Sequence, residues 1–165
     1  MESRNDFIIR TATDADRDQV ISLVSDVLAE FGLPFELKSK DADLQEIERD
    51  YIRAGGIFEV IEDRAGNLLG TYGLFPLTKD VCELRKMYFV PEIRGRGFGR
   101  HVLRRAINNA RQLGFTTVRL ETISVLERAV RLYTGFGFQP VPTEHVSARV
   151  DQAYILELSD NKGCA

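Results

Sequence analysis

The sequence has little of the chemistry on which disulfide frameworks and metal sites depend. Its 165 residues include two cysteines, two histidines and no tryptophan. Cys82 and Cys164 lie far apart, with no CxxC pattern and no histidine pattern beside them. We therefore expect neither a disulfide framework nor a zinc site.

Long apolar runs and an excess of positive charge are also missing. No apolar run approaches the roughly 20 residues needed to cross a bilayer, and charged side chains precede the first apolar stretch. The 22 Lys and Arg residues against 25 Asp and Glu residues give a net charge of -3, which argues against a general phosphate-backbone binder. We expect a cytoplasmic protein that works without nucleic acid or membrane, folded as one domain over residues 1–165.

Hydrophobic periodicity predicts a mixed series of strands and helices, with no internal repeat and no Pro/Gly/Ser-rich linker. The expected strands are 7–10, 57–63, 68–77, 81–90, 116–121 and 153–158, and the expected helices are about 14–31, 44–52, 101–113 and 124–135. This order, β-α-α-β-β-β-α-β-α-β, indicates an α/β (α+β) fold with a strand-loop-helix-strand unit at its centre.

A glycine-rich loop, Arg94–Arg100, lies between the strongest predicted strand and the strongest predicted helix. Glycines let a backbone approach a ligand closely, and the free N–H groups of a helix's first turn bind anions. Arginines 94, 96, 100 and 104 concentrate positive charge at this place. The segment predicts a site for a diphosphate; the simpler interpretation is a glycine turn with a solvated basic face.

Two common nucleotide motifs do not fit this loop. A GxGxxG pattern that starts at Gly95 meets Arg100 at its sixth position, and one that starts at Gly97 meets Val102. No Gly-Lys-Ser/Thr follows the glycines, which excludes a P-loop.

The pattern that fits is Arg94-x-x-Gly97-x-Gly99, the motif R/Q-x-x-G-x-G/A. It is preceded by LRKMYFVP at 84–91 and followed by AVRLYTGFGF at 129–138, which matches A-x-x-L-Y-x-x-x-G-F. With these segments in this order, the chain resembles the GNAT superfamily of acyl-CoA-dependent N-acetyltransferases. The resemblance implies a mostly antiparallel, twisted sheet with helices on both faces. It also implies acetyl-CoA as co-substrate, no metal, and transfer of the acetyl group to a primary amine by direct attack.

The resemblance also implies where the co-substrate binds. In this family the pyrophosphate of CoA sits on the backbone N–H groups of the motif loop, and the pantetheine amides pair with the edge of the preceding strand. Carried over, the cofactor-binding residues are Met87, Tyr88, Phe89, Arg94, Gly95, Arg96, Gly97, Phe98, Gly99 and Arg100.

Two residues take catalytic positions by the same resemblance. Tyr133 occupies the place of the tyrosine that protonates the CoA sulfur; its ring in the core is the structural alternative. Glu83 has the offset of the general-base glutamate of the histone-acetyltransferase branch, and Glu121 is the second candidate base. Glu83 has two other interpretations: an ion pair with Arg85, on the same strand face, or a solvated edge. Arg85 either binds an acceptor carboxylate or forms that ion pair.

The chain departs from the family at Leu126, where many members have an asparagine that contacts CoA. We expect this contact to be lost, or replaced by Ser124 or Arg128.

The acceptor is the least determined part. The family places it near Gly32–Glu36, Thr71–Phe75 and Pro140–His145, which show no diagnostic pattern. We prefer a small-molecule amine, such as an amino acid or amine metabolite. A protein amine, a CoA-binding sensor without turnover and a nucleic-acid module that uses the arginines are the alternatives, and a homodimer is possible.

Overall fold

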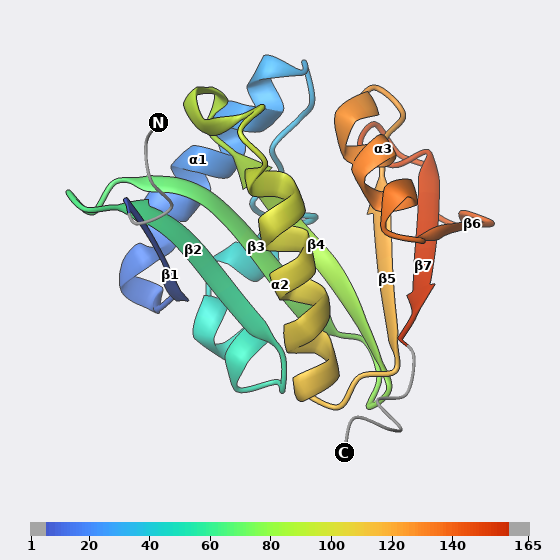
Figure 1. The fold of residues 1–165 in the computed structure, drawn as a ribbon. Coiled ribbons are helices and arrows are strands. Elements are labelled where there is room, and N and C mark those ends of the chain that lie inside the picture. Colours follow the sequence, from blue (N-terminus) through green and yellow to red (C-terminus); the bar gives the residue numbers. More distant parts are fainter. Residues whose placement is uncertain (1–5, 159–165) are drawn as a thin grey trace.

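The computed structural model describes residues 6–158, so Cys164 and the first five residues lie outside the described range. The described chain forms one seven-stranded sheet with helices on both faces (Figure 1). The strands are β1 (Phe7–Thr11), β2 (Ile57–Asp63), β3 (Leu68–Pro76), β4 (Val81–Phe89), β5 (Thr117–Thr122), β6 (Gln139–Val141) and β7 (Gln152–Glu157), and the α-helices are α1 (Arg17–Glu30), α2 (Phe98–Gln112) and α3 (Glu127–Gly135). The predicted mixed, mostly antiparallel fold is confirmed.

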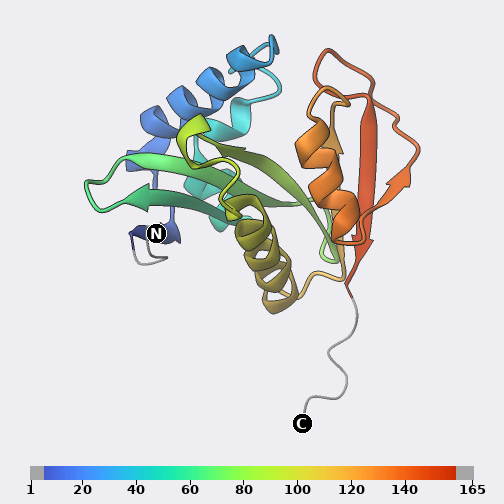
Figure 2. The same cartoon turned by 45° about the horizontal axis from the view of Figure 1, so that its top comes forward.

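The sheet divides into two arms, which join at one end only. Strands β1 to β4 form one antiparallel arm, and β5, β7 and β6 form the other. The parallel pairing of β4 with β5 covers only Val81–Glu83 and Thr117–Arg119. Beyond these residues the two strands diverge, as Figures 1 and 2 show. The later part of β4 therefore presents backbone groups without a strand partner on that side.

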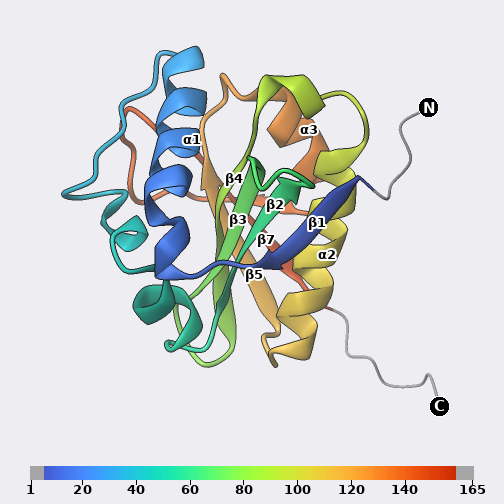
Figure 3. The ribbon, with the colours of Figure 1, turned by 90° about the vertical axis from the view of Figure 1, so that its left-hand side faces the viewer.

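Each face of the sheet has its own hydrophobic core. Helix α1 lies on one face and α2 on the other (Figure 3). Val102 and Leu103 of α2 pack with Leu84 and, farther along, with Tyr133 of α3. On the opposite face Val24 of α1 belongs to a second core, which also holds Leu44, Ile47, Tyr51 and Phe58. Complete burial of a large apolar side chain stabilises the folded state by about 1.5–3 kcal/mol. The two cores therefore fix the sheet between the helices.

The prediction of a regular α-helix over 44–52 is wrong, because the backbone of this segment has other hydrogen-bonding patterns. The chain forms a short 3₁₀-helix, η2 (Ala42–Leu44), and then a π-helix, η3 (Glu48–Ile52). The predicted apolar face is present, since Leu44, Ile47 and Tyr51 are fully buried. Packing against the sheet and the hydrogen bond of the Tyr51 hydroxyl to Asp43 hold this segment out of a regular α-helix.

Two features of the C-terminal arm differ from the sequence analysis: the start of α3 and the presence of strand β6. Ser124 does not cap α3, because its N–H and hydroxyl both bond to Asp151, and the helix begins at Glu127. Strand β6 has no signal in the sequence pattern, since it has only three residues and contains a proline. Both features depend on pairing with β7 and its neighbouring loop rather than on local pattern.

Strand β4 contains a bulge at Lys86. Thr71 of β3 pairs with Tyr88, but Gly73 pairs with Arg85, so β4 has one residue more than β3 at this point. Lys86 has a φ of 55°, a left-handed conformation that costs a non-glycine residue roughly 1–3 kcal/mol. The Thr71 hydroxyl donates to the Lys86 carbonyl at 2.7 Å and so supports the bulge from the neighbouring strand. The bulge turns the backbone of β4 just where β5 has left it.

Candidate active site

A cleft of about 1140 Å³ occupies the space where β4 and β5 diverge. The later half of β4 forms one wall, and the end of β5 with α3 forms the other. The end of α1 and the glycine-rich loop close the side next to α2. The pocket is as large as those that hold cofactor-sized ligands, and it is bounded by every segment that the sequence motifs singled out.

The glycine-rich loop enters α2 through two left-handed glycines. Gly95 has a φ of 78° and Gly97, the residue that precedes α2, has a φ of 83°. The N–H groups of the helix's first turn have no partner within the helix, and the helix dipole places partial positive charge there. The loop thus brings the start of α2 to the cleft, and among the expected cofactor-binding residues only Arg96 does not line the cleft.

Arg94, the first residue of the motif, anchors this loop through its side chain. Its guanidinium donates to the Phe89 carbonyl at 3.0 and 2.7 Å and to the two Glu30 oxygens at 2.7 and 3.1 Å. These bonds join the loop to the end of β4 and to α1. The arginine therefore positions the loop, and the backbone of the loop faces the cleft.

The α3 wall of the cleft includes Leu126, which stands where many family members have an asparagine that contacts CoA. Leu126 itself lines the cleft, and so does Arg128, two residues later. Ser124 is held by Asp151 and is not among the lining residues. Of the two replacements expected for the missing asparagine, the structure places only Arg128 at the cleft.

Tyr133 lies at the inner end of the cleft. Its side chain is 8% exposed, and its ring packs edge-on against Phe138 with the centroids 5.9 Å apart. Burial, with a smaller contribution from Tyr88, raises the pKa of Tyr133 well above its ordinary value of 10. Within residues 6–158 its hydroxyl has no hydrogen-bond partner, although the residue lines the cleft. The ring of Tyr133 therefore belongs to the core, and its protonated hydroxyl has no partner within residues 6–158, so its catalytic role stays a prediction.

Glu83 lies at the point where β4 and β5 part, and it is ion-paired. Its Oε1 accepts from Arg85 Nε at 2.6 Å, and its Oε2 lies 3.6 Å from Arg119 Nε. Glu121, the second candidate base, pairs with Arg119 at 2.9 Å and also lines the cleft. The pair between Glu83 and Arg85, one of the alternatives to the base role, is thus present, and Oε2 of Glu83 is the oxygen with the longer contact.

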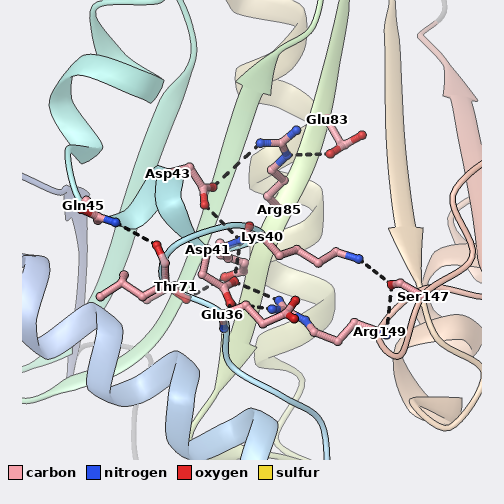
Figure 4. Close-up of polar contacts among 12 residues, drawn as sticks. Glu36, Lys40, Asp41, Asp43, Gln45, Thr71, Glu83, Arg85, Ser147 and Arg149 are labelled. Carbon is pink, nitrogen blue, oxygen red and sulfur yellow. Dashed lines mark hydrogen bonds and ion pairs between the residues drawn. The ribbon is translucent and has the colours of Figure 1, made fainter.

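These pairs belong to a longer chain of alternating charges across the cleft wall, much of which Figure 4 shows. The successive contacts are Arg149–Asp41 (2.5 Å), Asp41–Lys86 (2.9 Å), Lys86–Asp43 (3.2 Å), Asp43–Arg85 (3.9 Å), Arg85–Glu83 (2.6 Å), Glu83–Arg119 (3.6 Å) and Arg119–Glu121 (2.9 Å). The series contains four cations and four carboxylates. It connects the loop before β7, the η2 segment, the bulge of β4 and strand β5.

The buried centre of this series is Asp41. Its side chain is fully buried and accepts from both Arg149 and Lys86, and from the backbone N–H of Glu36. Burial alone would raise the pKa of Asp41, but these hydrogen bonds and the charge of Lys86 outweigh it and hold the pKa below its ordinary value. The carboxylate is therefore ionised, and it fixes the left-handed Lys86 from the α1 side of the sheet.

Only one of the three segments expected to hold the acceptor lines the cleft. Leu33 of the first segment lines it, but Thr71–Phe75 and Pro140–His145 do not. Strand β3 is the neighbour of β4 on the side away from β5, and none of its residues lines the cleft. Instead Ser39 and Lys40 line it from one side and Arg149 and Val150 from the other. Sequence patterning gave no sign of these residues, because each lies in a loop without periodicity.

Other chemistries find little support in the described part of the chain. Burial raises the pKa of Cys82 to about 12, so its thiol is a poor nucleophile. Across residues 6–158 no cluster of His, Cys, Asp and Glu side chains is arranged to hold a metal ion. The same residues include no helix that is long and apolar enough to span a membrane.

The split sheet, the glycine loop at the start of α2 and the tyrosine of α3 together define one class of protein. The model of the acetyltransferase (GNAT) family matches residues 22–138. The chain belongs to this family of N-acetyltransferases.

Individual relatives agree with this assignment. The uncharacterized N-acetyltransferase YjgM of Escherichia coli (strain K12) is 34% identical over 153 residues, which cover 87% of this chain and 91% of YjgM. A GNAT-family acetyltransferase from Staphylococcus aureus Mu50 has the same fold, with a TM-score of 0.85 at 22% identity, over 93% of this chain and 99% of that one. The putative acetyltransferase yncA of Salmonella typhimurium, solved with acetyl-CoA, has a TM-score of 0.75 at 21% identity, over 96% and 98%.

Proposed function

We propose that this protein transfers the acetyl group of acetyl-CoA to the primary amine of a small molecule, by direct attack of the amine on the thioester. The observation that carries the proposal is the cleft between β4 and β5, with a helix start for anions at one end and a protonated tyrosine at its inner end. Acetyl-CoA has the matching parts, a pyrophosphate and a thioester joined by an extended amide arm.

The binding half of the site is made of backbone groups. The pyrophosphate takes the N–H groups of residues Gly97–Arg100, where α2 begins. The amide arm pairs with the edge of β4 beyond Glu83, which β5 leaves without a partner. We assign the stabilisation of the negative charge that develops on the thioester oxygen to the backbone N–H groups next to the bulge at Lys86.

The proton transfers fall to two side chains. Glu83, through Oε2 or a bound water, takes the proton that the attacking amine must lose. Tyr133 donates its proton to the sulfur when the carbon–sulfur bond breaks, so the products are the acetamide and the CoA thiol. Tyr133 suits this task because its raised pKa keeps the hydroxyl protonated at neutral pH.

The proposal is tested by acetyl-CoA turnover against a panel of amines, with CoA binding measured separately by calorimetry. We expect an amine-dependent release of CoA thiol and an acetylated product detected by mass spectrometry. Tight CoA binding without turnover of any small-molecule amine or of any amine in a peptide panel would replace the proposal with a sensor function. Turnover confined to peptide amines would leave the chemistry and change the acceptor class.

A further inference from the structure

Most charged side chains on the proposed acceptor side of the cleft form one series of ion pairs, and one lysine lies outside it. The chain of ion pairs from Arg149 to Glu121 contains four cations and four carboxylates, each within 4.0 Å of an opposite charge. Glu83 and Glu121, the carboxylates that line the cleft beside these cations, already belong to this chain. Every carboxylate in this series of ion pairs already has a cationic partner, so none of the four is left to receive a cationic ligand.

Lys40 is a cation of this side that lies outside the chain of pairs. It lines the cleft from the loop before η2, and within residues 6–158 no carboxylate lies within 4.0 Å of its ammonium group. The ammonium donates to the Ser147 hydroxyl at 2.9 Å, on the loop before β7 (Figure 4). An ammonium group has three donors, so two remain for a ligand.

The surroundings of Lys40 are electropositive. Burial, followed by the positive charges of Arg149 and Lys86, lowers the pKa of Lys40 below 10.5, although Glu121 and Glu36 act in the other direction. An anion in the cleft therefore stabilises the charged form of this half-buried ammonium, which lies near other cations, more than it would stabilise a solvated lysine.

We infer that Lys40, with the Ser147 hydroxyl beside it, forms a subsite for a carboxylate on the acceptor, so that the acceptor is an amine that also carries an acid group. The inference rests on the proposed function and names its acceptor class. A single carboxylate on the acceptor would give Lys40 a counter-charge in direct contact, whereas Glu121 and Glu36 act on it from beyond 4.0 Å. A polyamine would place further positive charge beside Lys40, Arg149 and Arg85, where the carboxylates of the ion-pair chain are already paired.

Lys40 is a specificity-determining residue in this arrangement, and its place explains why. It lines the cleft on the side of the arm that holds β4, and Ser147, on the arm that holds β7, contacts its ammonium group. An acid group bound between them holds the acceptor across the open end of the cleft, so its amine points inward to Glu83 and the thioester.

The test measures kcat/KM for pairs of acceptors, each an L-amino acid and its neutral primary amide, across side chains of different size and charge, with spermidine as a third acceptor. Wild type is compared with Lys40→Met and with Lys38→Met. Lys38 is an exposed lysine of the same loop that does not line the cleft, so it is the matched control. Amine basicity differs between acid and amide, but that difference cancels when one acceptor pair is compared between two variants.

We expect Lys40→Met to lower the kcat/KM ratio of acid to amide by about tenfold to a hundredfold, which is the value of one charged hydrogen-bonded contact, and to leave kcat/KM for the amides unchanged. Lys38→Met should leave the ratio as in wild type. A ratio that Lys40→Met does not change, or spermidine as the best wild-type acceptor, would overturn the inference while the acetyltransferase function stands.

A second measurement separates the inference from the function. Binding of N-acetyl amino acids and of their amides is measured by calorimetry on the protein saturated with CoA. If no acceptor is turned over, the proposed function fails, but the subsite still predicts that the acids bind more tightly than the amides and that Lys40→Met removes the difference. Equal binding of acids and amides by wild type would contradict the subsite directly.

Discussion

The carboxylate of Asp41 accepts hydrogen bonds from both terminal guanidinium nitrogens of Arg149, at 2.5 and 3.0 Å, although the two residues are 108 positions apart in the sequence. One residue lies in the loop after α1 and the other in the loop before β7, so the pair joins the two arms of the sheet on the side where β4 and β5 have separated. The pair is buried, and Lys86 from the bulge of β4 completes it.

Asp41→Asn should destabilise the protein by about 3 kcal/mol, because it leaves Arg149 and Lys86 buried without their shared carboxylate. Urea unfolding at neutral pH measures the change. The control is Asp18→Asn: Asp18 has 88% of its side chain exposed and pairs with the neighbouring Arg17, so a change below about 0.5 kcal/mol is expected. Equal losses in the two variants would show that the buried pair adds nothing.

The same pair predicts a pH dependence. The folded-state pKa of Asp41 is lowered, so its contribution is present above its unfolded pKa of about 4 and is lost as the pH falls through the folded value. The difference in unfolding free energy between wild type and Asp41→Asn should therefore shrink in acid below about pH 4. A difference that grows in acid would mean that Asp41 is not held ionised.

Gly97→Ala should weaken acetyl-CoA binding, because a left-handed φ of 83° strains any residue with a Cβ and shifts the N–H groups that begin α2. We expect KM for acetyl-CoA to rise about tenfold or more. Gly114→Ala is the matched control: Gly114 follows the other end of α2, has a φ of 93°, and like Gly97 has open space where a Cβ would lie. Both variants should lose similar stability, and a rise in KM with both would attribute the effect to folding.

Tyr133→Phe should lower kcat roughly a hundredfold, the usual contribution of a positioned acid, with little change in KM for acetyl-CoA. The ring stays in place against Phe138, so the melting temperature should move little. Because the pKa of Tyr133 is raised above 10, the wild-type kcat should show no loss from this residue below pH 10. A Tyr133→Phe enzyme with wild-type kcat would leave Tyr133 with a packing role alone.

Glu83→Gln and Glu121→Gln are compared to locate the base. Both side chains line the cleft and both contact Arg119, but Glu83 also pairs with Arg85, so its substitution removes one ion pair more. We expect Glu83→Gln to lower kcat about a hundredfold and Glu121→Gln to have the smaller effect. The reverse order would move the base to Glu121, and small effects from both would assign deprotonation to water.

Much of this protein is determined by local sequence. Apolar patterning predicts all the described strands but β6, and the glycine loop before α2 predicts an anion site, because a helix start and its glycines depend on neighbouring residues only. The position of Tyr133 at the cleft follows from the family resemblance, since helical spacing alone favours a core tyrosine, and only the structure shows that its hydroxyl has no partner within residues 6–158.

The acceptor side is decided by tertiary structure alone. Asp41 meets Arg149, and Lys40 meets Ser147, between loops more than a hundred residues apart, and no periodicity records such contacts. The bulge at Lys86 and the early end of the β4–β5 pairing likewise depend on the neighbouring strands. A net charge of -3 describes only the composition of the chain. The folded arrangement shows that Lys40 lines the cleft and that no carboxylate of residues 6–158 lies within 4.0 Å of its ammonium group.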